Sequence, residues 1–404
     1  MSDAVETDIL VAGAGPAGLC AGLSLALAGR NVVVAGPPDT RATARTVALF
    51  DGSVRFLQSL GVWDSLAPTA APLKVMRIVD DTGSLFKAGP MDFRAEEIGL
   101  EQFGFNIENA ALVAALEAAL ANEPLAQRNE DLVTGYAFAN DGVTARLSRG
   151  GDVDAKLVVA ADGRSSPARE AAGIKTRAWS YPQMAFTAIL SHRQPHNGAS
   201  TEFHTREGPF TLVPLPGTAT AAHRSSLVWM MHPDSARKLK TLAPEKLIGA
   251  IEQQSHFLLG AITLERAGAF IPIEGLSARA MTAQRLALVG EAAHVFPPIG
   301  AQGLNLGLRD VAHLAECFDT TKPLDAGDAS MLAAYERARR ADVASRQISV
   351  DLLNRTLLAG LLPIDVMRAA GMTALRTIAP LRHFAMREGV LPGLGAPAVM
   401  RRPA

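Results

Sequence analysis

Near its start the chain reads ILVAGAGPAG, a short apolar run that leads into a turn rich in glycine. Residues 9 to 12 have the unbroken apolar pattern of a strand buried on both faces of a parallel sheet. Gly13, Gly15 and Gly18 have the spacing of a G-x-G-x-x-G turn. Helix-forming sequence follows, and residues 31 to 35 have the pattern of a second strand. This order of elements predicts a βαβ unit and therefore an α/β fold with a parallel sheet.

The spacing of the three glycines has a physical explanation. Gly13 permits a tight turn, Gly15 lets a pyrophosphate approach the backbone, and Gly18 lets the helix pack closely on the strand. The free N–H groups at the start of the helix then face the phosphate charge. A glycine-rich turn without a ligand is the alternative, but the flanking strand and helix favour a dinucleotide site.

The second strand lacks a residue that dinucleotide sites usually have. An acid at its end would hydrogen-bond the adenosine ribose. In NVVVAGPPD, Gly36 occupies that place and Asp39 comes three residues late. This departure weakens the case for an ordinary NAD site. We expect the ribose to find other partners, such as backbone groups around Gly36 and Pro37.

Composition excludes several classes of protein. The chain has 404 residues, enough for roughly two or three structural regions, and its 48% hydrophobic and 20% charged residues are typical of a globular enzyme. A net charge of −1 provides no basic field for nucleic acid. Cys20 and Cys317 form neither a metal cluster nor a disulfide framework. We therefore expect no metal site and a reducing, cytoplasmic environment.

An apolar stretch near the N-terminus resembles a membrane span. Residues 9 to 29 carry no charge and are long enough to cross a bilayer. Asp3, Glu6 and Asp8 precede them in place of the basic leader of a signal peptide, and glycines interrupt the run early. We expect a buried strand and helix here and no transmembrane segment.

Two further strand ends carry acidic residues. Asp162 and Gly163 follow the apolar run of LVVAADGRSSPAR, a pattern that alone is typical of a simple turn. In LALVGEAAHVFPPIGAQGLNLGLRD, residues 286 to 310, Glu291 follows a strand and a helix comes later. A carboxylate at the carboxyl end of such a strand faces the ligand side of an open sheet and can accept hydrogen bonds from a polyol. The amides of residues 300 to 304 are placed to face a ring that gains negative charge.

The three motifs, in this order, resemble those of the FAD-dependent aromatic hydroxylases. The best match is the UbiH/UbiF/COQ6-like branch, the monooxygenases of ubiquinone biosynthesis. The resemblance covers the whole chain and includes ARTVALFDGSVRFLQSLGVW at 44 to 63, FGFNIENAALVAAL at 103 to 116, GPFTLVPLPG at 208 to 217 and VDLLNRTLLAGLLPIDVMRAAG at 350 to 371.

Together with the strand and helix patterns, the resemblance predicts three regions in an α/β fold. A discontinuous, Rossmann-like FAD-binding domain comprises residues 1–75, 100–175 and 275–330. A β-sheet substrate domain is inserted as residues 76–99 and 176–274. A C-terminal helical region follows from residue 331 to residue 404.

The resemblance also implies a set of FAD-binding residues. They are Gly13, Gly15, Pro16, Ala17, Gly18, Gly36, Arg45, Asn109, Asp162, Gly163, Gly290, Glu291, Pro298, Gly300, Ala301, Gln302, Gly303 and Leu304. Within this set, Glu291 stands where the family usually has Asp and would accept a bond from the ribityl chain, while residues 298 to 304 would pass along the isoalloxazine. Asp162 and Gly163 would lie near the pyrophosphate and shape the approach of NAD(P)H.

Several of these residues have simpler interpretations. Arg45, implied to meet phosphate or ribityl oxygens, can be a surface ion-pair residue, and Asn109 can be only a helix cap. His294 is interpreted as a structural residue that fixes its turn by hydrogen bonds. Asp310 is expected to cap or pair within its own helix.

The family implies an NAD(P)H- and O₂-dependent hydroxylase. Reduced FAD would form a C4a-hydroperoxide that hydroxylates the ring of a polyprenylated phenol in ubiquinone biosynthesis. No catalytic base can be named from the sequence, and the choice between NADH and NADPH stays open. Two alternatives remain: a flavin-dependent reductase of a lipid, and a non-catalytic flavoprotein subunit of a quinone-biosynthesis complex.

The C-terminal region is basic. From Glu336 to Ala404 there are eleven arginines, no lysine and five acids, a net charge of +6. Arginines among apolar residues are typical of an amphipathic helix on an anionic surface. We therefore expect peripheral attachment to the inner membrane, or to a membrane-bound complex, through residues 346 to 390. A helical bundle packed on the FAD domain is the alternative.

Overall fold

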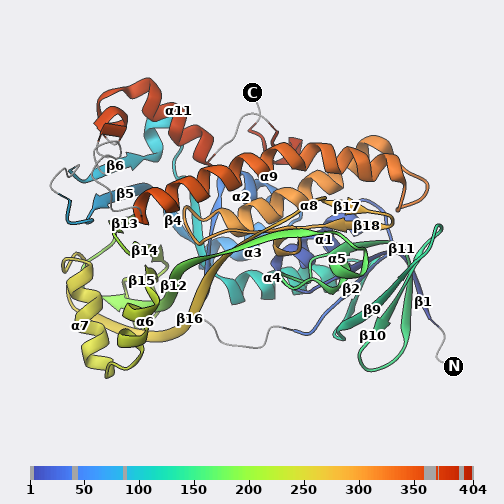
Figure 1. The fold of residues 1–404 in the computed structure, drawn as a ribbon, viewed down its shortest axis with the longest axis horizontal. Helices are drawn as coiled ribbons and strands as arrows, with labels where there is room; N and C mark the ends of the chain where they lie inside the picture. Colours follow the sequence, from blue (N-terminus) through green and yellow to red (C-terminus); the bar gives the residue numbers. More distant parts are fainter. Residues whose placement is uncertain are drawn as a thin grey trace.

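The computed structural model describes residues 4–38, 44–84, 89–358, 370–371, 373–390 and 395–402, and it has three sheets (Figure 1). Strand β1 (Val5–Ala12), helix α1 (Pro16–Leu27) and strand β2 (Val32–Ala35) form the expected βαβ unit. The long apolar stretch near the N-terminus is thus split between a strand and a helix. Among the described residues, no helix is long and apolar enough to cross a membrane.

The first sheet is largely parallel, and β1 lies at its centre. Its main path has the order β17-β18-β11-β1-β2-β8, and β9 and β10 extend it as an antiparallel pair beside β11. The remaining strands are β8 (Ala126–Asn129), β9 (Val133–Phe138), β10 (Val143–Leu147), β11 (Asp152–Ala160), β17 (Thr282–Ala283) and β18 (Leu286–Leu288). The helices packed around this sheet are α4 (Asn109–Ala121), α5 (Pro167–Ala171), α8 (Gln302–Thr321) and α9 (Ala329–Leu358).

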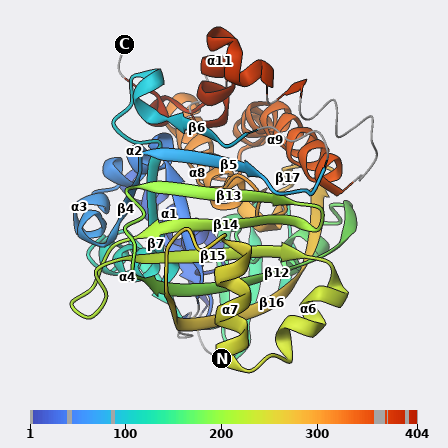
Figure 2. The same ribbon diagram turned by 90° about the vertical axis from the view of Figure 1, so that its left-hand side faces the viewer.

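The second sheet has eight strands in the order β19-β16-β12-β15-β14-β13-β5-β6. They are β5 (Val75–Asp80), β6 (Met91–Arg94), β12 (Thr176–His192), β13 (Ala199–Thr205), β14 (Gly208–Leu215), β15 (Arg224–Met231), β16 (Ile262–Ala278) and β19 (His294–Val295). Helices α6 (Pro233–Lys240) and α7 (Pro244–Gln254) cover one face, in front of the sheet in Figure 2. Strands β12 and β16 are long enough, at 17 residues each, to extend from this sheet towards the first.

A third sheet of three strands lies between the other two. It consists of β3 (Thr46–Phe50), β7 (Gly104–Glu108) and β4 (Ala71–Leu73). Hydrogen bonds join it to the second sheet: Thr46 Oγ1 donates to Ser226 Oγ at 2.9 Å, and Asn106 Nδ2 donates to the Pro214 carbonyl at 2.9 Å. The short helices here are α2 (Asp51–Ser59), α3 (Trp63–Leu66), η1 (Ala67–Thr69) and η2 (Ala95–Ile98).

The C-terminal region is helical where it is described. After α9, helix α11 (Ala379–Val390) packs against the edge of the second sheet, where Met386 and Val390 join an apolar cluster with Met91 and Phe93 of β6. The turns η3 (Gly290–Ala292) and η4 (Ala398–Met400) complete the elements. The division of the chain into three regions with the stated boundaries stays a prediction.

Candidate functional site

The predicted site residues come together because four parallel strands end in register. Ala12 of β1 pairs with Ala35 of β2 and Ala160 of β11, and Ala160 pairs with Leu288 of β18. The residues that follow these four strands therefore lie at one carboxyl edge. This edge is where open α/β sheets bind their ligands.

The geometry of the glycine turn excludes a side chain at two of its three glycines. Gly13 has φ +113°, and a Cβ there would lie 2.2 Å from the Ala161 carbonyl oxygen. A Cβ on Gly18 would lie 1.9 Å from the Gly13 oxygen, so this glycine permits the close packing of α1 on the turn. A Cβ on Gly15 would meet nothing within 4 Å. Backbone N–H groups thus border open space at the start of α1, whose first turn contains no acid.

Gly36 is also required by packing. A Cβ at this position would lie 2.9 Å from the Ala14 nitrogen and 3.3 Å from the Ala14 Cβ. A glutamate or aspartate here would therefore push against the glycine turn itself. This contact explains why the usual acid is absent, although the partner of the ribose stays a prediction.

Asp162 lies beside the glycine turn, with one carboxylate oxygen held and the other unpaired. Its Oδ2 accepts a hydrogen bond from the Ala168 backbone N–H at 3.1 Å, and its buried Oδ1 has no partner among the described residues. Burial raises the pKa of Asp162, although the neighbouring Ser166 hydroxyl, the bond from Ala168 and the charge of Arg169 act in the opposite direction. An unpaired buried oxygen calls for a donor, which a ligand hydroxyl or a bound water can supply.

Glu291 lies on the η3 turn directly after β18, and its side chain is exposed. The neighbouring Gly290 packs tightly between two helices. A Cβ on Gly307 of α8 would lie 3.1 Å from the Gly290 Cα, and one on Gly290 would lie 3.4 Å from the Ala17 Cβ of α1. Glu291 thus follows a glycine that is held between α1 and α8, but its contact with a ribityl chain stays a prediction.

A buried charge network behind this turn fixes its position. Asp310 Oδ2 accepts hydrogen bonds from Gly290 N at 2.9 Å and His294 Nε2 at 2.7 Å, while Oδ1 accepts one from Arg339 Nε at 2.7 Å. Arg339 also donates to Asp342 at 2.6 Å. Burial would raise the pKa of Asp310, but the neighbouring His294 and the charge of Arg339 hold it below its ordinary value.

The expectation that Asp310 caps or pairs within its own helix is therefore wrong. Its partners lie on η3, β19 and α9 because it faces the inside of the molecule, where it is fully buried. The structural interpretation of His294 agrees with its bond to Asp310. The sequence did not single out Arg339, which is one of three arginines in YERARR, residues 335 to 340. A second contact on this turn comes from Arg169, whose Nη1 donates to the Ala292 carbonyl at 2.7 Å.

The loop from Pro298 to Leu304 leads into α8. Pro298, Gly300 and Gly303 are exposed, and Ala301 is the N-cap of α8 with φ 52°. A left-handed alanine is strained and must be held by its surroundings. Asn305 provides this support, because its Nδ2 donates to the Ala301 carbonyl at 2.6 Å. The N–H groups in the first turn of α8 are thereby left free to face negative charge.

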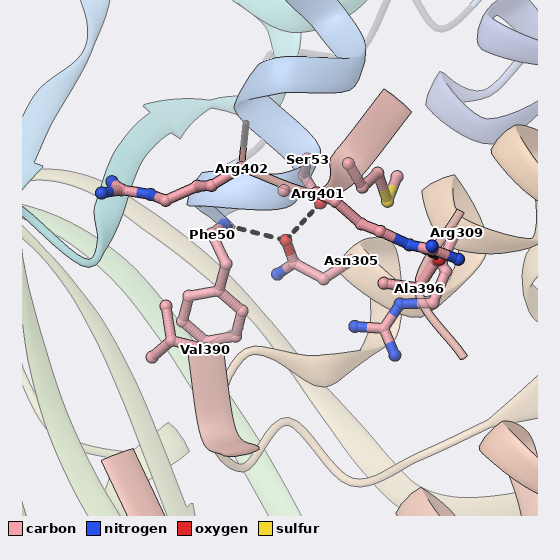
Figure 3. Close-up of a pocket in the computed structure, with 10 residues that line it drawn as sticks. Phe50, Ser53, Asn305, Arg309, Val390, Ala396, Arg401 and Arg402 are labelled. Carbon is pink, nitrogen blue, oxygen red and sulfur yellow. Dashed lines mark hydrogen bonds between the residues drawn. The ribbon is translucent and has the colours of Figure 1, made fainter. Parts of the chain in front are cut away.

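Asn305 is the second functional residue that the sequence did not reveal. Its Oδ1 accepts bonds from Phe50 N at 2.9 Å and Ser53 Oγ at 2.7 Å, which ties α8 to α2 (Figure 3). A pocket of about 230 Å³ lies beside it, between α2 and the C-terminal segment. The pocket is lined by Phe50, Gly52, Ser53, Asn305, Arg309, Val390, Ala396, Met400, Arg401 and Arg402.

Arg45 and Asn109 lie next to each other. Strands β3 and β7 pair antiparallel from Thr46 and Glu108, and the Asn109 backbone N–H donates to the Arg45 carbonyl at 2.9 Å. Asn109 is the first residue of α4 rather than its N-cap, so the helix-cap interpretation is wrong. The Arg45 side chain is exposed. The roles of both side chains towards the cofactor stay predictions.

These features fit FAD. The open space beside Gly15 at the start of α1 suits a pyrophosphate, and the unpaired Asp162 oxygen and the exposed Glu291 carboxylate suit polyol hydroxyls. The acid-free first turn of α8 suits a ring that becomes anionic. Gly15, Asp162, Glu291 and the first turn of α8 would hold the cofactor.

Comparisons with known proteins agree with this fit. The family model described as FAD binding domain matches residues 6–349. Ubiquinone hydroxylase UbiL of Rhodospirillum rubrum is 34% identical, over 95% of this chain and 89% of the relative. The 3-demethoxyubiquinol 3-hydroxylase of Escherichia coli is 31% identical, over 94% of this chain and 97% of the relative.

Solved structures show the same fold. The p-nitrophenol 4-monooxygenase PnpA of Pseudomonas putida superposes with a TM-score of 0.79 at 18% identity, covering 99% of this chain and 100% of that one. HpxO of Klebsiella pneumoniae, complexed with FAD and uric acid, gives 0.77 at 18% identity, with 96% and 97% covered. The chain therefore belongs to the FAD-binding family of flavin-dependent monooxygenases, in the branch that contains the ubiquinone-biosynthesis hydroxylases.

Proposed function

We propose that this protein hydroxylates the aromatic ring of a polyprenylated phenol in ubiquinone biosynthesis, with FAD as cofactor, NAD(P)H as reductant and O₂ as oxygen donor. One observation supports this proposal above the others. The loop that contains Pro298 leads from the carboxyl edge, with its glycine turn and Glu291, to the second sheet. There Ile299 packs with Ala185 and Met230. The carboxyl edge of the first sheet, which we call the cofactor edge, therefore adjoins a sheet that can hold an aromatic substrate.

When bound, FAD supplies the redox chemistry, and the residues of this chain supply position and electrostatics. The start of α1 would hold the pyrophosphate through backbone N–H groups. The Asp310 network holds the Glu291 turn, and Asn305 holds the start of α8, whose N–H groups would face the ring of the bound cofactor. Pro297 and Pro298 stiffen the loop between them. The chain has one glycine motif of this kind, which suits a reductant that binds only transiently.

Turnover with isotopically labelled oxygen tests the proposal. The FAD-loaded protein is reduced anaerobically with NADH or NADPH and then mixed with ¹⁸O₂ and a prenylated phenol. We expect one ¹⁸O atom in the hydroxylated product. Reduction of the substrate without oxygen incorporation would identify a lipid reductase. A flavin that NAD(P)H does not reduce would indicate a non-catalytic subunit.

We further propose that α11 and the segment before it dock on an anionic membrane or a membrane-bound complex, from which the prenylated substrate is taken. Ile378, Leu381 and Phe384 recur every three residues and are 48%, 42% and 64% exposed. Arg376 and Arg387 are exposed nearby. Apolar residues flanked by arginines suit the interface of an anionic bilayer.

The hypothesis for residues 346 to 390 needs revision in part. Arg382 donates to both oxygens of Glu97, at 2.6 and 2.7 Å, so its charge is already neutralised. Residues 359–369, which include Arg368, lie outside the described residues. Flotation with anionic and neutral liposomes at low and high salt tests docking, with Phe384→Ser against Phe257→Ser, an exposed phenylalanine distant in sequence, as control. Equal flotation of both variants would refute a role for α11.

A further inference from the structure

The two faces of the second sheet have different surroundings. Phe186, Phe203 and Leu212 pack with Leu239 and Ile251 of α6 and α7, so this face is the outer one. Because side chains alternate along a strand, the neighbours of these residues point to the other face. We call this opposite face the inner face. In Figure 2 it is turned away from α6 and α7, towards the first sheet.

The inner face touches the cofactor edge at two places. Ala185 and Met230 pack with Ile299, which lies in the loop before α8. Ile189 and Leu215 pack with Ala44, the residue before Arg45. These two contacts lie one on each side of a single row of cross-strand partners.

That row crosses the inner face, includes a carboxylate on β13 and continues to Ile78 of β5. Thr187 of β12 pairs with Val228 of β15, Val228 pairs with Thr211 of β14, and Thr211 pairs with Glu202 of β13. All four side chains are half-buried, although the row lies between two apolar contacts that are fully buried. The row therefore lies on the face of the sheet that meets the cofactor edge, where the proposed aromatic substrate belongs.

Glu202 is held closely through one oxygen and only weakly through the other. Its Oε1 lies 2.6 Å from His204 Nε2, and its Oε2 accepts a bond from Thr211 Oγ1 at 3.3 Å, which is long for a hydroxyl donor. The His204 and Glu202 side chains are 8% and 20% exposed. Asp80 of β5, in register beside His204, is a further ionisable residue on this face. A carboxylate fixed by an imidazole is the arrangement of an oriented general base.

We propose that Glu202, oriented by His204, accepts the proton of the substrate's phenolic hydroxyl during hydroxylation. This assignment rests on the proposed function. As the ring carbon bonds to the incoming oxygen, the hydroxyl becomes strongly acidic. Its O–H bond then breaks, the proton joins Glu202 Oε2, and the electron pair forms the ring carbonyl. No electron is gained or lost in this transfer.

A binding experiment tests the contact without turnover. The oxidised, FAD-loaded protein is titrated with a prenylated phenol and with its O-methyl ether, and the flavin absorption change gives each Kd. We expect the wild type to prefer the phenol by roughly tenfold, because a hydrogen bond to a charged acceptor is lost in the ether. Glu202→Ala abolishes this preference. Thr201→Val, on the outer face of the same strand, retains it.

A rate experiment tests the proton transfer. Glu202→Gln keeps an acceptor oxygen but cannot take the proton, so we expect it to bind the phenol, retain FAD reduction, and hydroxylate about 10²- to 10⁴-fold more slowly. The pH profile of its kcat/KM should also lack the acidic limb. The rate should fall less for phenols that have a more acidic hydroxyl.

The outcomes separate this assignment from the proposed function. Equal loss of phenol and ether binding in Glu202→Ala would indicate a merely structural carboxylate and overturn the assignment. An unchanged pH profile and rate in Glu202→Gln would overturn it as well. A wild-type protein that prefers the phenol through Glu202 but incorporates no oxygen would instead refute the hydroxylase function and leave the binding contact standing.

Discussion

Replacing Asp310 with Asn is expected to destabilise the protein by about 3 kcal/mol. The substitution keeps the shape of the side chain but removes a charge that is fully buried and accepts three hydrogen bonds. One carboxylate oxygen becomes an NH₂ group that faces another donor. Breaking a buried ion pair costs about 3–5 kcal/mol. We take the lower end because Arg339 keeps its bond to Asp342.

Urea unfolding followed by circular dichroism measures this loss, with Asp319→Asn as the matched control. Asp319 lies on the same helix but is exposed, so its replacement should shift the midpoint little. A second readout is FAD affinity, which should fall because Gly290, next to Glu291, loses its acceptor. If the two variants unfold at the same urea concentration, the buried carboxylate does not hold this region together.

The pH dependence has a definite sign. The folded-state pKa of Asp310 is lowered, so its contribution to stability is present above the ordinary carboxyl pKa of about 3.9 and is lost as the pH falls through the lowered value. The difference between wild type and Asp310→Asn should therefore be full at neutral pH and shrink in acid below about pH 4. A difference that instead grows in acid would contradict this account.

Three further changes have definite expected outcomes. Glu291→Ala should weaken FAD binding by about tenfold, because a hydrogen bond to a charged acceptor is worth about 1.5–3 kcal/mol. Titration of refolded apoprotein with FAD measures the affinity, and an unchanged affinity would rule out the ribityl contact. Gly36→Ala should lower FAD occupancy after purification, because the new Cβ would lie 2.9 Å from the Ala14 nitrogen. An occupancy equal to that of the wild type would show that the glycine turn can shift to accept a Cβ. Ser166→Ala should cost about 1 kcal/mol in urea unfolding, because Ser166 Oγ caps α5 by accepting from Arg169 N; no loss would mean that the cap is dispensable.

Local patterns were sufficient to predict the βαβ unit and the position of the cofactor cradle. The spacing of Gly13, Gly15 and Gly18 between an apolar strand and a helix follows from contacts within a few residues, such as the Gly13 oxygen against Gly18. Resemblance to a family supplied the remaining cofactor residues. Their side-chain contacts with FAD stay predictions, whereas the common edge that gathers the strand-end residues follows from the strand register.

Other features depended on contacts between distant segments. The sequence suggested a local role for Asp310, because nothing near it in the chain indicates that Arg339 is directed at it from another helix. In the sequence, Gly36 stands where an acid is usual, and only the structure shows that this position packs against Ala14. Nothing in the sequence around Glu202 indicates a role, since only the pairing of four strands places it in the row across the inner face.

The sequence by itself therefore determined the fold class, the family and the cofactor, since these depend on short patterns and on resemblance. Only the tertiary structure decided which charges are buried together, which oxygen of Asp162 lacks a partner and which face of the second sheet meets the cofactor edge. The physical reason is that burial and hydrogen bonding are set by strands and helices that are far apart in the chain, and a single sequence does not reveal their register.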